Sequence, residues 1–350
     1  MTFDVTVLIP TFKRAYFLQH VLKALEEQTY RNFDVLIVLK PSGDGTEQIL
    51  EMFQKRKILN IRLVVQKKGY VTDALNLGMS LVKSKILAFL DDDAIPPANW
   101  LKTHVDTYSG DISGVAGNVV PAILDDDGST LRVLKASEIL PDYPPFKNQL
   151  ARQLWNRPIR HQEDYLVYVS KAGGIEINYE LTKQARQGKV VNSLLAMGTN
   201  LTLLTETIRG FAFSGPWVLG LPWDNYLGWI LWKKGYKTVF NPQAKVYHLV
   251  HGETLSRGGL QRKKRKRRLL SETEYQLLYF RLLGQEKELS VVTRMLMLGF
   301  SFLVNAKKNP DQVTLNLTWL LLGNSIGLKW ILSKKMGGSY SPLRDLEKLL

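Results

Sequence analysis

Four short apolar runs alternate with amphipathic helical patterns in the first 120 residues. Each run has the length of a strand, is rich in β-branched residues or leucine, and is bounded by proline, glycine or charged residues. Strand–helix–strand units with short connections form a mostly parallel sheet that helices cover on both faces. We therefore expect an α/β protein. The predicted strands are Val5–Ile9, Val35–Leu39, Ile61–Val65 and Ile86–Leu90, and the helical patterns between them are Tyr16–Gln28, Thr46–Lys57 and Thr72–Val82.

Ligands of such sheets bind beyond the carboxyl ends of the strands. The segments Pro10–Arg14, Lys40–Asp44 and Asp91–Asp93 each follow a predicted strand directly, so we expect them at one edge. The three consecutive acids of the last segment repel one another, and a cationic group must offset that repulsion. Oxygen ligands suit Mg²⁺ or Mn²⁺, which would also hold a diphosphate. The alternative is an exposed acidic turn without a metal.

Residues 121–250 are less regular, with proline-rich and glycine-rich stretches that predict loops and short strands. A short helix is expected over Asp224–Lys234, since Gly235 supplies the usual left-handed stop. Two strands are expected after it, at Thr238–Phe240 and Lys245–Leu249.

The chain has a strongly positive net charge, and part of the excess lies in one short run of basic residues. It has 47 Lys plus Arg against 32 Asp plus Glu, a net charge of +15, and residues 262–268 are all basic. Such a run favours a polyanionic partner. No aromatic residue interleaves with it, so anionic lipid or a substrate pyrophosphate is expected rather than nucleic acid. The absence of cysteine excludes disulfides, a thiol nucleophile and cysteine-ligated metal sites.

Two apolar segments, Leu289–Ala306 and Val313–Leu332, follow the basic run. Each approaches the roughly 20 residues that cross a bilayer. They predict a membrane hairpin, an interfacial pair of helices, or amphipathic helices packed on the main domain. Trp319 and Trp330 lie near segment ends, where they could sit at a lipid interface, and Arg294 could extend its charge to that interface. Basic residues flank both outer ends, and no signal peptide opens the chain, so the catalytic part is expected on the cytoplasmic side.

Four sequence stretches occur in an order that resembles glycosyltransferase family 2. They are IPTFKRAYFL, EEQTYRNFDVLIV with SGDGT, LAFLDDDAIPPANWL, and PWDNYLGWILWKKGYKTVFNPQAKVYH. The resemblance covers about residues 1–250; the C-terminal part resembles processive synthases of the cellulose synthase type and small archaeal mannosyltransferases built as a reduced version of them. It implies a GT-A catalytic domain over 1–258, with a nucleotide-binding half (1–120) and an acceptor half (121–258). A basic interfacial helix region (259–288) and membrane-associated helices, as a hairpin, over 289–350 would follow.

The resemblance also implies roles for single residues. The last acid of a DXD motif binds the metal on the diphosphate, and the first approaches the ribose. The acid of the family's Glu-Asp motif is the base that deprotonates the acceptor. The implied catalytic residue is Asp224; the implied donor-binding residues are Pro10, Thr11, Arg14, Lys40, Asp73, Asp91 and Asp92; the implied ligands of Mn²⁺ or Mg²⁺ are Asp91, Asp93 and His248.

The chemistry needs this set independently of the family. Inversion at a sugar carbon needs one base on the face opposite the leaving group, and a cation that stabilises the departing nucleoside diphosphate. Each candidate also has a structural alternative. Asp224 could cap the helix that it starts, and His248 and His251 could pack or cap rather than bind metal.

The chain departs from the family pattern at Leu39-Lys40-Pro41, where Asp-Asp-Gly is usual. One of those acids commonly contacts uracil, so its loss disfavours a UDP donor and favours a guanine nucleotide such as GDP-mannose. Lys40 could face a base carbonyl or a phosphate, and Asp44 or Asp73 could replace the acid. Trp223 replaces the Glu before Asp224, and the Trp of Gln-x-x-Arg-Trp is absent, which argues against long processive synthesis.

Together these features predict a membrane-associated, metal-dependent inverting hexosyltransferase at the cell membrane, facing the cytoplasm. It would move mannose first, glucose second, from GDP-mannose or a UDP-hexose to a lipid-linked glycan, as in N-glycan precursor assembly. One alternative uses polyprenyl phosphate itself as the acceptor. Another, from a different class, is a non-catalytic adaptor that binds anionic lipid or nucleic acid.

Overall fold

The computed structural model describes residues 3–125, 128, 130–134, 157–215, 217–220, 222–251, 262–296 and 310–348. The chain forms two compact units, each assembled from three stretches. Unit 1 comprises Met1–Tyr143, Tyr179–Phe213 and Leu227–Gly252; unit 2 comprises Pro144–Asn178, Ser214–Tyr226 and Glu253–Leu350.

Unit 1 is built on one large sheet with the strand order β10-β12-β6-β11-β4-β1-β2-β3, to which β5 adds beside β12 and β7 beside β6. Parallel ladders join β4, β1, β2 and β3 and also join β6 to β12, while β11 runs antiparallel to both β4 and β6. The predicted α/β class with a mixed, mostly parallel sheet is confirmed. The strands are β1 (Val5–Thr11), β2 (Phe33–Leu39), β3 (Ile61–Val65), β4 (Ile86–Leu90), β5 (Ala94–Ile95), β6 (Ile112–Leu124), β7 (Leu131–Val133), β10 (Val191–Asn192), β11 (Asn200–Leu204) and β12 (Lys237–Leu249).

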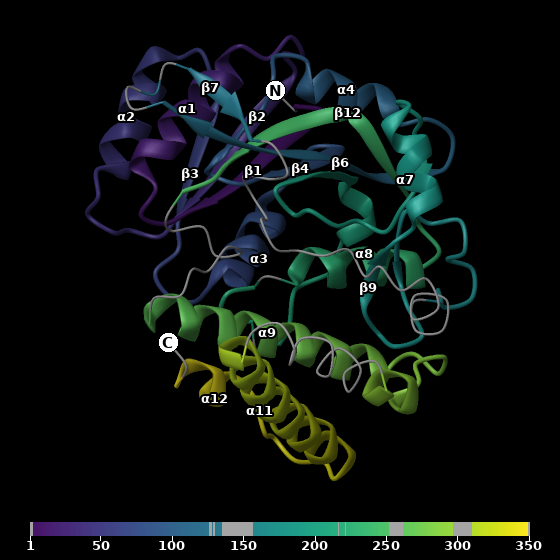
Figure 1. The fold of residues 1–350 in the computed structure, drawn as a ribbon. Helices are drawn as coiled ribbons and strands as arrows, with labels where there is room; N and C mark the ends of the chain where they lie inside the picture. The colour runs from purple at the N-terminus through teal and green to yellow at the C-terminus, as the bar shows by residue number, and fades with distance from the viewer. Residues whose placement is uncertain are drawn as a thin grey trace. The chain divides into compact units, whose positions relative to one another are not determined.

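Helices cover both faces of this sheet (Figure 1). Side chains that alternate along the central strands, such as Val5, Val7 and Ile9, pack into one buried core with α1, α2 and α4. On the opposite face Leu8 lies over Gly78 of α3, where a Cβ atom would be only 2.3 Å from the leucine. The helices of unit 1 are α1 (Ala15–Glu26), α2 (Thr46–Arg56), α3 (Val71–Leu81), α4 (Trp100–Thr107), α7 (Tyr179–Arg186), the 3₁₀ helix η1 (Thr205–Ile208) and most of α8 (Trp223–Lys233).

The two strands predicted near the end of unit 1 are a single strand, β12, with an irregularity in its middle. Its ladder with β6 pairs Asn241 with Gly117 and then Lys245 with Asn118, so three residues of β12 have no ladder partner. Pro242 lies among them and has no N–H to donate. The polar and proline residues that predicted a break therefore form a bulge within one strand.

A buried polar network supports that bulge. The side-chain amide of Asn200, which is fully buried, donates to the carbonyls of Asn118 (3.0 Å) and Ala244 (2.8 Å). Its carbonyl oxygen accepts from Trp100 Nε1 (2.8 Å) and lies 2.9 Å from His104 Nε2. Every hydrogen-bonding atom of this amide is thus satisfied, as a buried amide requires.

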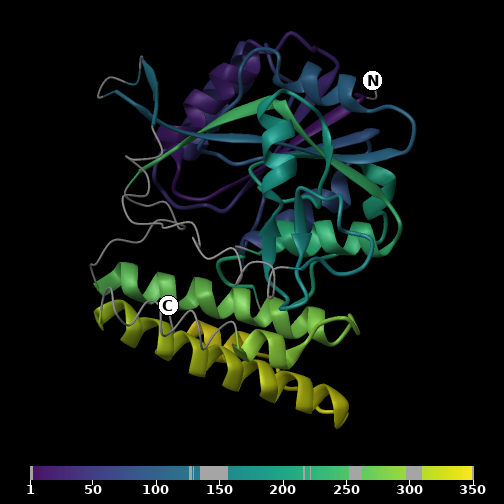
Figure 2. The same cartoon turned by 45° about the vertical axis from the view of Figure 1, so that its right-hand side comes forward.

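Unit 2 contains the hairpin β8 (Val167–Val169) and β9 (Ile175–Ile177) and the helices α9 (Arg262–Leu283), α11 (Pro310–Lys335) and α12 (Leu343–Glu347). Helices α9 and α11 lie side by side in both views (Figures 1 and 2). Gly323 and Gly327 of α11 permit the close approach, since a Cβ atom there would meet Gln276 and Phe280 of α9 at 2.9 and 2.1 Å. The basic run opens α9 as helix.

Two expectations for the apolar C-terminal segments are wrong in detail. Trp330 is buried inside unit 2 rather than exposed at an interface. Arg294 is also buried: it bonds to the carbonyl of Ala172 (3.1 Å) and stacks on Tyr279 at 3.9 Å. Among the helices that the structure describes, none is both long and apolar enough to cross a membrane. Residues 297–309, which include part of the predicted hairpin, lie outside the described residues, and so does the side chain of Trp319.

Candidate active site

The acidic turn after β4 lies at the edge predicted for it. The parallel registers align the ends of the strands, with Thr11 beside Leu39 and Leu39 beside Val65, and β4 runs next to β1 in the same direction. The turn itself is closed by a backbone bond from Ala94 N to Asp91 O (3.2 Å). The segments that follow β1, β2 and β4 therefore share one edge.

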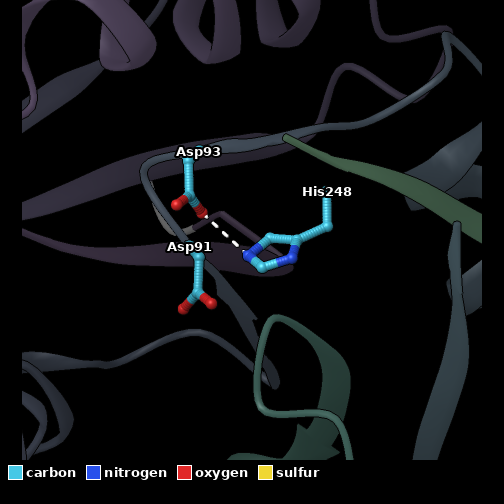
Figure 3. Close-up of side chains that lie close together, drawn as sticks. All are labelled: Asp91, Asp93 and His248. Atoms are coloured by element: carbon cyan, nitrogen blue, oxygen red, sulfur yellow. Dashed lines mark ion pairs between the residues drawn. The ribbon is translucent and has the colours of Figure 1, made fainter. Parts of the chain in front are cut away.

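A short ladder brings a distant histidine to this turn. Ala94 of β5 pairs with His248 of β12, and Leu249 N donates to Asp93 O (2.9 Å). As a result, single ligand atoms of Asp91, Asp93 and His248 all lie within 4.8 Å of one another. Figure 3 shows the three side chains close together, with the His248 ring facing Asp93, whose Oδ1 lies 3.1 Å from His248 Nε2. The structure thus brings together the three residues that the sequence indicates as metal ligands.

The two buried acids of the turn differ in their electrostatics. Burial and the adjacent charge of Asp93 raise the pKa of Asp92 well above its usual range. Burial alone would do the same to Asp93, but hydrogen bonds from His248 and His251 hold the pKa of Asp93 well below its usual range. Asp93 is therefore the carboxylate that stays ionised, as a metal ligand must be.

Arg14, at the start of α1, supplies the positive charge that the acid cluster needs. Its Nε lies 3.9 Å from Asp92 Oδ1, and its terminal nitrogen lies 3.4 Å from both ring nitrogens of His251. His251 Nε2 in turn lies 2.9 Å from Asp93 Oδ2, and its ring stacks on Phe17 at 4.2 Å. Each oxygen of Asp93 thus faces a different histidine.

The remaining donor-binding candidates cluster at the ends of β1, β2 and β3. Thr11 is buried at the end of β1 with Pro10 before it, and its carbonyl accepts from Lys40 N (3.0 Å). Lys40 Nζ donates to Gly69 O (2.8 Å). The carboxylate of Asp73 accepts from Tyr70 N (2.7 Å), which makes it a cap of α3.

Asp44 also has a structural role, which weakens it as a replacement for the missing family acid. It accepts hydrogen bonds from the hydroxyls of Thr46 (2.7 Å) and Ser42 (2.9 Å) and from Ala15 N (3.1 Å). Although desolvation opposes the change, these bonds lower the pKa of Asp44 to about 2. Asp44 therefore fixes the starts of α1 and α2.

Comparisons with known proteins identify the region that carries this edge. A model of the family described as "Glycosyl transferase family 2" matches residues 6–168, which include β1 to β7 and the acidic turn. Residues 6–168, slightly less than half of the chain, thus resemble glycosyltransferase family 2. The Asp91–Asp93 turn lies within the matched residues.

Curated relatives match only part of the chain. Glycosyltransferase AglE of Haloferax volcanii is 37% identical over 119 residues, which are 33% of this chain and 39% of that protein. The glucosyl-dolichyl phosphate glucuronosyltransferase of the same organism is 24% identical over 123 residues, 35% of this chain and 39% of that protein. The chain thus spans about two fifths of the length of these relatives.

Solved structures support the GT-A fold. Mannosyltransferase PcManGT from Pyrobaculum calidifontis, solved with GDP-Man and Mn²⁺, matches with a TM-score of 0.51 at 15% identity, over 100% of this chain and 84% of that one. GalNAc-T7, solved with UDP, GalNAc and Mn²⁺, also gives 0.51, at 14% identity over 81% of this chain and 51% of that one.

The family's candidate base, Asp224, belongs to unit 2 and is buried at the start of α8. The helix begins at Trp223, so Asp224 is its second residue rather than its cap. One carboxylate oxygen accepts from the next residue, Asn225 N (2.7 Å). An acid in the first turn also interacts favourably with the helix dipole.

Sequence patterns gave no indication of Glu274, which binds the segment that leads to Asp224. It lies in α9, fully buried, and accepts the backbone N–H groups of Val218, Leu219 and Gly220. Nothing distinguishes it in the sequence from the nearby Glu272, because its partners lie 54–56 positions away.

Proposed function

We propose that this protein is a metal-dependent inverting glycosyltransferase that transfers a hexose from a nucleotide diphosphate sugar to a lipid-linked glycan. The observation that carries the proposal is the convergence of Asp91, Asp93 and His248 at the end of β4, within the region that matches the family model. The edge around them presents Arg14 and Lys40, cations of the kind that bind phosphate.

The donor set fits a divalent cation. Two carboxylates and one imidazole suit Mn²⁺, and Mg²⁺ is also compatible with carboxylates. The ionised state of Asp93 supplies the charge that the ion requires. When bound, the ion would stabilise the charge on the departing diphosphate. Asp91, Asp93 and His248 would hold it, and Arg14 and His251 would keep Asp93 oriented.

Asp224 is proposed as the base that takes the proton of the acceptor hydroxyl. Its carboxylate is buried in the first turn of α8, so its position is set by the segment that precedes the helix. A base positioned in this way removes the proton as the acceptor oxygen attacks the sugar carbon. The new bond from the acceptor oxygen to the sugar carbon forms as the bond from that carbon to the diphosphate breaks, so the nucleoside diphosphate departs and the configuration at the carbon is inverted.

The donor is proposed to be GDP-mannose. Leu39 and Lys40 replace the two family acids, one of which commonly contacts uracil. The two candidate substitutes, Asp44 and Asp73, are already bound to backbone groups. A lysine cannot accept the N–H of a uracil ring as a carboxylate does, but it can donate to a base carbonyl or to a phosphate. This reasoning favours guanine over uracil, with glucose as the second choice of sugar.

The proposed lipid-linked acceptor requires contact with a membrane, and the surface of unit 2 supports such contact. Leu321, Leu328 and Leu332 form an exposed apolar stripe on α11, and Lys329 and Lys334 are exposed on the same helix. Apolar side chains flanked by lysine are typical of helices that lie on an anionic lipid surface. The basic start of α9 adds to this charge in the same unit.

The proposal is tested by the melting temperature of the full chain with Mn²⁺ and a panel of GDP-mannose, UDP-glucose and their nucleoside diphosphates. Ligand binding to the folded state at 100 times Kd adds about 2.7 kcal/mol, enough for a clear shift. GDP-mannose should raise the melting temperature most, and only with the metal.

The matched variants are Asp93→Asn, which should abolish the Mn²⁺-dependent shift, and Asp106→Asn, which should not change it. Asp106 is an exposed acid of the same unit that pairs with Lys102 (2.8 Å). If no nucleotide stabilises the wild-type protein, or if Asp93→Asn responds as the wild type does, the proposal is wrong. A non-catalytic lipid-binding protein would then be the better interpretation.

A further inference from the structure

Glu274 of α9 is a buried acid that accepts hydrogen bonds from one short stretch of backbone. Its two carboxylate oxygens accept the N–H groups of three consecutive residues, Val218 (2.5 Å), Leu219 (2.8 Å) and Gly220 (2.9 Å). The side chain has no exposed surface. Successive backbone N–H groups that point into one concavity form an anion-binding nest, and here a carboxylate of the same chain occupies it.

The nest is connected by backbone bonds to the proposed base. Gly220, which adopts a φ of +72°, also accepts a hydrogen bond at its carbonyl from Trp223 N (3.0 Å). Pro222 O accepts from Tyr226 N (3.0 Å), which forms the first turn of α8. Glu274 therefore fixes one end of a turn whose other end carries Asp224.

Other residues of α9 contact the same segment. The guanidinium of Arg281 stacks on the ring of Tyr226 at 3.9 Å and donates to the carbonyl of Ser214. Partial burial and then the charge of Asp224 raise the pKa of the Tyr275 hydroxyl, which indicates that α9 lies within electrostatic reach of Asp224. These contacts come from successive turns of α9 and bind both ends of the segment 214–226.

We propose that Glu274 is a positioning residue for Asp224, and that contacts from α9 hold the segment 214–226 in the conformation that places Asp224 for catalysis. This inference rests on the proposed role of Asp224 as the base. A carboxylate can accept all three N–H groups, whereas an amide in its place presents one oxygen and directs an NH₂ group toward backbone donors. Isosteric neutralisation of Glu274 should therefore release the turn without removing side-chain volume.

The decisive variant is Glu274→Gln in the full chain, with hydrogen exchange and kinetics measured on the same preparation. Exchange of the amides of residues 218–220 should become at least tenfold faster. The kcat for transfer to a hydroxyl acceptor should fall at least tenfold, while KM for the donor and the Mn²⁺-dependent melting shift stay unchanged. Glu274→Asp, which keeps the charge on a shorter side chain, should give intermediate values of both and serves if Glu274→Gln does not fold.

Glu288→Gln is the matched control. Glu288 is a partly exposed acid of the same unit whose carboxylate accepts a single backbone N–H, that of Arg160 (3.0 Å). Its substitution should change neither exchange at 218–220 nor kcat. Unchanged exchange in Glu274→Gln, or faster exchange with an unchanged kcat, would overturn the positioning role. Failure of the proposed function is distinguishable, because the wild-type protein would then show neither nucleotide binding nor transfer.

Discussion

The acids of the β4 turn and Asp224 are held in opposite ways. In unit 1, side chains surround the carboxylates: Asp93 faces two histidines, and Arg14 lies beside both His251 and Asp92. In unit 2, the segment that carries Asp224 is fixed through its backbone, whose N–H groups converge on Glu274 of another helix. The first arrangement orients charges, and the second orients a stretch of main chain.

Under the proposed function, this difference corresponds to different tasks of the two units. Carboxylates that are to bind a metal repel one another before the ion arrives. Neighbouring cationic or hydrogen-bonding side chains must therefore offset their negative charge. A base needs a fixed position relative to the proton that it takes, so rigidity of its backbone matters more than the charge around it. Substitutions in the β4 turn should therefore change metal-dependent nucleotide binding, whereas substitutions around Asp224 should change the rate of transfer.

The largest expected effect that tests this separation is that of Asp224→Asn. Loss of a general base typically costs a factor of about 10² to 10⁴ in rate, so transfer to a hydroxyl acceptor should fall by that factor. Mn²⁺-dependent nucleotide binding should stay as in the wild type. A polyprenyl phosphate acceptor is already ionised and needs no base, so retained turnover with that acceptor alone would identify the protein as a polyprenyl-phosphate hexose synthase.

The control for Asp224→Asn is Asp345→Asn, which removes a carboxylate of unit 2 bound to Tyr340 (2.7 Å) and Lys348 (2.9 Å). It should leave the rate with either acceptor unchanged. A full rate of Asp224→Asn with the hydroxyl acceptor would contradict the assignment of the base and the comparison between the units.

The sequence predicted much of unit 1 because its features are local. Each strand from β1 to β4 is a compact apolar run, and the acids stand directly after one of them. It also indicated His248, because that residue ends the stretch that resembles the family's acceptor-side segment. The convergence itself depends on β5, a strand of two residues, which no periodic pattern could reveal.

Unit 2 was less predictable for a related reason. The apolar segments around Arg294 and Trp330 suggested lipid contact, yet both side chains are buried within the unit by partners distant in the sequence. No sequence pattern predicts that Glu274 is buried, because a single acid in a charged helix is normally exposed to solvent. Hydropathy records how apolar a segment is, and does not distinguish a lipid surface from another helix as the group that covers it.

A smaller effect, on stability rather than rate, is expected from the buried network of unit 1. Asn200→Ala should lower the free energy of unfolding by about 2–4 kcal/mol, because it leaves Trp100, His104 and two main-chain carbonyls buried without their partner. Urea denaturation measures the change. Asn99→Ala, at an exposed residue whose side chain caps no helix bond, should cost less than about 0.5 kcal/mol. Equal costs would show that the network does not support the β12 bulge.

The smallest expected effect concerns pH and the same network. Burial lowers the pKa of His104 from 6.5 to about 4, so the folded state favours the neutral ring, with Nδ1 3.1 Å from the Thr202 hydroxyl. Because the folded-state pKa is the lower one, its contribution is complete above about pH 6.5 and is lost as the pH falls toward 4. The free energy of unfolding should thus decrease by about 2 kcal/mol between pH 7 and pH 5 through this residue. His104→Gln should be less stable at pH 7 but should lose less on acidification, since the other histidines contribute equally to both proteins. Parallel stability curves for the two proteins between pH 7 and pH 5 would show that His104 is not held neutral. The free energy of unfolding would then not depend on the charge state of this side chain.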